Sequence, residues 1–149
     1  MRTIIVVAIL AAVGFSVGSA NAKGKVDAKL LNGRIEFKTD AGKKSGEARV
    51  IIEVYSHDGS MAAKNSPTET YGEFTDFPSH TVNLTVDGSK TRAEISGGYH
   101  KISLDPIGPK PWKFSYVLTL NFDDGSHLVY VRNNVKISQK KDAVRGANL

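Results

Sequence analysis

The residues best suited to recognition lie in one segment, 65–80, where aromatic rings alternate with carboxylates. An exposed aromatic ring can pack against a sugar ring or a partner protein, and a neighbouring carboxylate accepts hydrogen bonds. Trp112 follows a proline-rich stretch and is a further aromatic candidate. The candidate binding residues are Tyr71, Glu73, Phe74, Asp76, Phe77 and Trp112. The alternative is that the phenylalanines close one end of the core and Trp112 belongs to it.

Catalytic residues show no comparable pattern. The four histidines lie far apart and none belongs to a His-Glu-x-x-His zinc motif; they are His57, His80, His100 and His127. The sequence contains no Gly-x-Ser-x-Gly nucleophile elbow. Glu53, Glu94 and Asp105 can supply carboxylates for a small hydrolase, but nothing in the sequence selects a pair. We therefore predict no metal site and no cofactor, with a hydrolase kept as the alternative from another class.

Three Asp-Gly-Ser triplets begin at Asp58, Asp87 and Asp124, each after an alternating run. Aspartate oxygens in loops are common Ca²⁺ ligands, but no triplet continues into the Asp-x-Asp-x-Asp spacing of an EF-hand. Asp-Gly is typical of tight hairpin turns, because glycine adopts positive φ without steric cost. The triplets therefore predict turns.

The N-terminus has the features of a secretory signal peptide. Met1-Arg2 carries a positive charge, Ile4 to Val13 is unbroken apolar sequence, and Ala20-Asn21-Ala22 supplies small residues for cleavage. The apolar run is shorter than the roughly 20 residues that span a bilayer, which disfavours a retained anchor. We predict a signal peptide over 1–22 and a secreted or periplasmic domain over 23–149, without stable membrane insertion.

Composition is that of a globular domain, with 149 residues, no cysteine, 40% hydrophobic residues and a net charge of +5. Basic residues concentrate at the ends of the mature chain, at Lys23, Lys25, Lys29, Lys136, Lys140, Lys141 and Arg145. Nucleic-acid binding is not expected, because these ends lack interleaved aromatics and a dense basic run. We expect basic, mobile termini.

Apolar and polar residues alternate along most of the mature chain, which predicts an all-β fold. The predicted strands are 31–39, 47–57, 81–86, 91–96, 99–104, 112–122, 127–132 and 135–138. Their number and spacing favour an antiparallel two-sheet β-sandwich of immunoglobulin-like arrangement, with a small β-barrel or jelly roll as alternatives.

Loops on a rigid β scaffold are common recognition surfaces, and no catalytic constellation is visible. We therefore predict a non-catalytic binding domain that recognises an extracytoplasmic protein or glycan. The alternatives are the small hydrolase and a subunit of a surface assembly. The sequence leaves the oligomeric state open.

Overall fold

The computed structural model describes residues 24–149 except 67, 76–78, 142 and 148. Within these described residues the protein is all-β, with one short helix, α1 (Arg92–Ile95). The eight strands are β1 (Leu30–Ala41), β2 (Arg49–Tyr55), β3 (Met61–Lys64), β4 (His80–Val86), β5 (Tyr99–Asp105), β6 (Trp112–Phe122), β7 (His127–Ile137) and β8 (Ala143–Ala147). The predicted signal peptide lies outside the described residues, within which no helix is long and apolar enough to cross a membrane.

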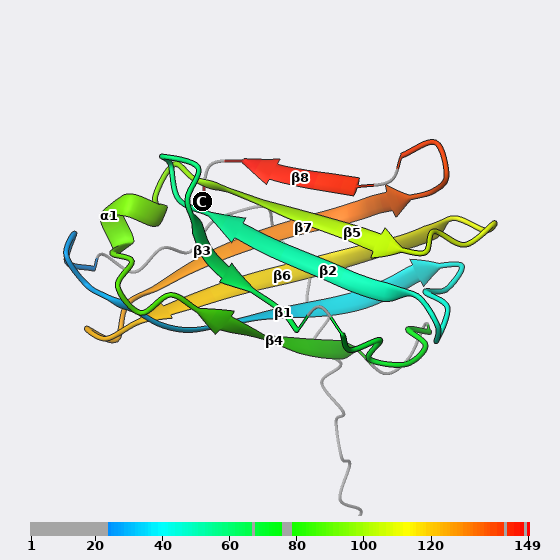
Figure 1. Ribbon diagram of the computed structural model, residues 1–149, viewed down its shortest axis with the longest axis horizontal. Helices are drawn as coiled ribbons and strands as arrows, with labels where there is room; N and C mark the ends of the chain where they lie inside the picture. Colours follow the sequence, from blue (N-terminus) through cyan, green and yellow to red (C-terminus); the bar gives the residue numbers. More distant parts are fainter. Residues whose placement is uncertain (1–23, 67, 76–78, 142, 148) are drawn as a thin grey trace, which may run out of the picture.

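All neighbouring strands are antiparallel and belong to one sheet of order β7-β6-β1-β4-β3-β2-β5-β8. The sheet curls until its two edge strands, β7 and β8, approach each other, so that the molecule is a nearly closed, elongated barrel (Figure 1). Across this seam the Arg132 side chain of β7 donates a hydrogen bond of 2.9 Å to the carbonyl of Arg145 on β8. The small-barrel alternative fits this architecture, whereas a two-sheet sandwich is not confirmed.

Alternation along the strands fills the barrel, as the buried and exposed positions of β6 and β2 show. Aromatic rings pack at the end of the barrel opposite α1. The Phe37 ring lies 5.4 Å from Trp112, 5.6 Å from Phe114 and 5.6 Å from Phe74, centroid to centroid. This aromatic cluster anchors β1, β6 and the segment that precedes β4 against one another.

The predicted strand over 91–96 is wrong, because α1 occupies Arg92–Ile95. Thr91 and Glu94 form a capping box in which each side chain accepts a hydrogen bond from the other residue's backbone N–H. Two strands, β3 and β8, were not predicted at all, and β8 lies within the basic C-terminal region that was expected to be mobile.

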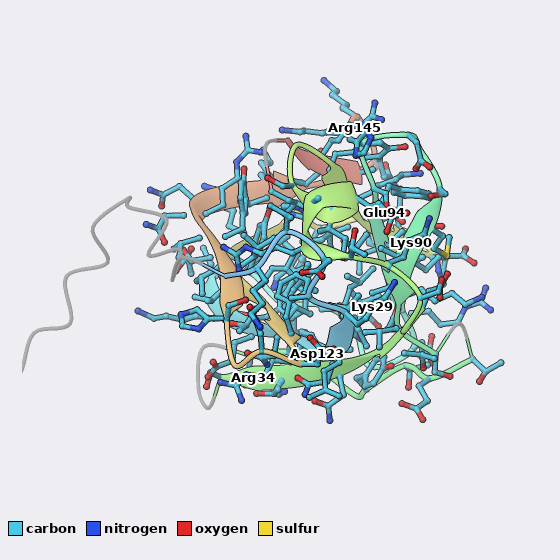
Figure 2. All side chains as sticks on the ribbon, turned by 90° about the vertical axis from the view of Figure 1, so that its left-hand side faces the viewer. Lys29, Arg34, Lys90, Glu94, Asp123 and Arg145 are labelled. Atoms are coloured by element: carbon cyan, nitrogen blue, oxygen red, sulfur yellow. The ribbon has the colours of Figure 1, made fainter. Side chains whose placement is uncertain are left out.

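Lys29, Lys90, Glu94 and Asp123 come from separate segments of the chain and lie at the α1 end of the barrel (Figure 2). Lys29 donates through Nζ to the Ser89 carbonyl at 2.9 Å, and its backbone N–H donates to Asp123 at 3.0 Å.

The three Asp-Gly-Ser triplets form the turns that were predicted: in each, the aspartate accepts a hydrogen bond from the backbone N–H of the serine at 2.9 Å. Gly59 and Gly125 have positive φ, as those turns require.

Candidate functional site

Two of the six candidate binding residues lie in the core. Phe74 is fully buried and stacks on His80 at 4.3 Å between centroids, and Trp112 is buried with its indole Nε1 donating to Thr39 Oγ1 at 3.0 Å. Neither ring offers an exposed face for a ligand. Their positions match the alternative in which these aromatics close one end of the core.

The other described candidates remain near the surface but do not form one platform. Tyr71 is half-buried in a left-handed conformation with φ of 57°, and its hydroxyl accepts a hydrogen bond from Asn65 Nδ2 at 3.4 Å. Glu73 is exposed and forms an ion pair of 3.0 Å with Lys43. Asp76 and Phe77 lie outside the described residues.

Lys44 was not predicted to matter, yet it fixes this segment in place. Its buried Nζ donates to the carbonyls of Ser45, Ala48 and Gly72 at 2.8, 2.5 and 2.6 Å, and it lies 4.9 Å from the centroid of the Phe74 ring. Burial lowers the pKa of Lys44 to about 8, against the opposing effect of the Glu73 carboxylate. With its three donors engaged by the chain itself, Lys44 stabilises the fold rather than offering a nucleophile to substrate.

The hydrolase alternative requires titratable side chains that converge, and the described residues do not bring them together. His100 is buried and hydrogen-bonds Tyr116 Oη at 2.7 Å, while His57 Nδ1 lies 2.8 Å from a backbone carbonyl, that of Glu94. In the described ranges no hydrogen bond joins an imidazole to a carboxylate, and no group of three or more His, Asp or Glu residues is arranged to hold a metal ion.

The outer face of β1, β6 and β7 carries a groove with a volume of about 560 Å³, and we call it the β1–β6–β7 groove. Its outward-facing lining combines a carboxylate, an ammonium, two hydroxyls, two amides and two valines. These residues are Glu36, Lys38, Ser79, Ser115, Val117, Val131, Asn133 and Asn134. None was a candidate from the sequence.

Strand register produces this lining. Val117 on β6 lies directly between Glu36 on β1 and Val131 on β7, so half-buried valines form an apolar floor beside the carboxylate. One step along, Lys38 pairs with Ser115, where the register between β6 and β7 shifts. A β-bulge of this kind locally bends a strand and redirects its side chains.

The bulge is stabilised by its own contacts. Asn134 has a φ of 56°, a left-handed conformation that asparagine tolerates better than most residues. Its backbone N–H donates to Ser115 Oγ at 3.4 Å, and that hydroxyl in turn donates to Asp40 at 2.6 Å. The polar wall of the groove is therefore held by the fold before any ligand arrives.

No family model, curated protein or solved structure matches this chain. The function is therefore inferred from the groove's own chemistry. Its volume lies in the range of small-molecule sites, and it places several hydrogen-bonding groups around an apolar floor, which is the usual composition of such sites.

Proposed function

We propose that the protein is an exported, non-catalytic binding domain that recognises an extracytoplasmic glycan in the β1–β6–β7 groove. The observation that carries the proposal is the lining of that groove: charged, hydroxyl and amide side chains around the Val117 and Val131 floor. A saccharide ring presents hydroxyls at its edge and C–H groups on its face, which match these two kinds of surface. Export rests on the N-terminal sequence, 1–22.

The sequence predicts either a protein or a glycan as the ligand, and the shape of the groove favours a glycan. A protein partner of ordinary affinity buries about 800 Å² on each side, usually around aromatic anchors. The groove lining contributes no outward-facing aromatic side chain among the described residues. A short saccharide fits the volume and needs only a few directed hydrogen bonds.

A glycan microarray incubated with the purified protein tests the proposal, followed by calorimetry on each saccharide retained. Ser115→Ala and Asn133→Ala should each weaken binding about two- to twelvefold, because each removes a hydrogen-bonding group worth about 0.5–1.5 kcal/mol. Ser103→Ala is the matched control, since Ser103 lies on the outer face of β5, away from the groove.

Circular dichroism on each variant establishes that the fold is retained. Saccharide binding that survives both groove substitutions, or that falls equally with Ser103→Ala, would place the ligand elsewhere. If the microarray retains the protein on no saccharide, glycan recognition is refuted.

A further inference from the structure

Three exposed cationic residues lie where β5, β8 and β7 approach one another, and we call Lys101, Arg132 and Arg145 the basic triad. Lys101 on β5 and Arg145 on β8 are directly opposite in the antiparallel register. Arg132 reaches across the seam from β7 to the Arg145 carbonyl at 2.9 Å. All three side chains are exposed.

Directly opposed like charges on neighbouring strands destabilise a sheet unless something neutralises them. The row continues across β2 and β3 as Glu53 and Lys64, so it carries three cations and one carboxylate. None of the ion pairs between described residues involves a member of the basic triad. Glu53, directly opposite Lys101, offsets one of these charges, so the row keeps a net charge of +2.

Arg145 is also held in place. Its guanidinium carbon lies 3.8 Å from the centroid of the Tyr99 ring, and Tyr99 stacks on Tyr55 at 4.7 Å with an interplanar angle of 19°. Tyr99 lies diagonally across from Arg145, so the Arg145 side chain points away from Lys101 and forms a cation–π contact with the Tyr99 ring. An arginine fixed in this way loses less conformational entropy when it binds a ligand.

From these contacts we infer that the basic triad binds the carboxylate groups of an anionic, uronate-bearing polysaccharide. The planar guanidinium matches a carboxylate with two parallel hydrogen bonds, and Lys101 adds a second positive charge beside it. A lipid surface would need apolar side chains to insert nearby. The exposed large hydrophobic residues of the described chain are Val26 and Leu31, and neither belongs to β5, β7 or β8.

Two members of the basic triad, Lys101 and Arg145, lie on strands that do not line the β1–β6–β7 groove, whereas Arg132 of β7 lies between the groove residues Val131 and Asn133. Figure 2, which views the barrel from its α1 end, shows Arg145 and the β1 residue Arg34 on opposite sides of the ring of strands. The Lys101 and Arg145 part of the basic triad therefore lies on a different outer face from the β1 wall of the groove, and substitutions there can be tested separately.

Titration of the protein with tetragalacturonate, against the neutral maltotetraose, tests the inference. Lys101→Gln and Arg145→Gln should each weaken tetragalacturonate binding at least fivefold and reduce its dependence on salt, because each removes one charge contact. Lys136→Gln is the matched control: it removes the same charge from exposed β7 sequence outside the triad and should change binding less than twofold. Ser115→Ala, in the groove, should leave tetragalacturonate binding unchanged.

Equal loss with Lys136→Gln would show a response to net charge alone and overturn the inference. Binding to phosphatidylglycerol vesicles that depends on Lys101 and Arg145, without binding to tetragalacturonate, would also overturn it. If the protein binds tetragalacturonate but no neutral saccharide, the proposed glycan recognition by the groove is refuted and the inference for the basic triad is supported.

Discussion

Acid should destabilise this protein through a single buried histidine. His100 is fully buried; its ring contacts Tyr130 on β7 at 4.6 Å between centroids, and a Cβ on Gly146 of β8 would overlap it. Burial chiefly, and the charge of Arg132 secondarily, lower the pKa of His100 from 6.5 to about 4. The unfolded chain therefore binds the histidine proton at a higher pH than the folded protein does.

Stability contributed by neutral His100 is present above about pH 6.5 and is lost as the pH falls toward 4. Between pH 7 and pH 5 these two pKa values correspond to a loss of about 2 kcal/mol in the free energy of unfolding. The stabilising carboxylates do not contribute in this window. Asp58, Asp87, Glu94 and Asp124 have lowered pKa values because hydrogen bonds to serine or threonine favour their charged forms, so they lose stability only at lower pH.

Urea denaturation at pH 7 and pH 5 measures this loss. His100→Gln retains a polar side chain that can reach Tyr116 but cannot titrate, so the difference between the two pH values should largely disappear. His57→Gln, a change at an exposed position next to the Asp58 turn, should leave the loss of about 2 kcal/mol intact. An equal pH dependence in wild type and His100→Gln would refute the role assigned to His100.

Three further substitutions test the packing, each by urea denaturation. Gly146→Ala should destabilise the fold by about 1–3 kcal/mol, because the added Cβ would overlap the His100 imidazole. Lys44→Met should cost about 3 kcal/mol, since it leaves the carbonyls of Ser45, Ala48 and Gly72 without their ammonium donor. Trp112→Ala should cost about 3–5 kcal/mol through the cavity it leaves, whereas an exposed binding residue at that position would cost little. A stable Trp112→Ala protein would contradict its assignment to the core.

The strands that were predicted correctly are those whose alternation reflects burial on one side of the sheet. Trp112 to Phe122 is the clearest example, since every second side chain of β6 is buried. Alternation could not distinguish a sandwich from a barrel, because both architectures bury one face of each strand. Helix α1 was missed although Thr91 and Glu94 have capping-box spacing, a local signal that competed with the alternation of Ala93 and Ile95.

The groove was harder to predict than the fold. Its polar residues occupy outward positions that look like any solvated strand face, and two of them, Asn133 and Asn134, lie at the bulge opposite Ser115. Asn133 and Asn134 appeared in the sequence as a break between two strands, whereas β7 continues through both residues. Lys44 was missed for a different reason. A lysine in a Gly-Lys-Lys-Ser-Gly loop is expected in solvent, and only the folded chain shows three carbonyls around its ammonium.

Arg145 on the edge strand β8 admits a second physical explanation, because charged side chains on an edge strand prevent it from pairing with another chain. Edge protection needs a positive charge of any shape at position 145, whereas carboxylate recognition needs the planar fork. Arg145→Lys separates the two, since it keeps the charge and removes the bidentate geometry. Edge protection predicts that the variant keeps the oligomeric state of wild type and binds tetragalacturonate like wild type. Recognition through the basic triad predicts an unchanged oligomeric state with binding that falls at least threefold, and only that result requires the guanidinium that the Tyr99 ring holds in place.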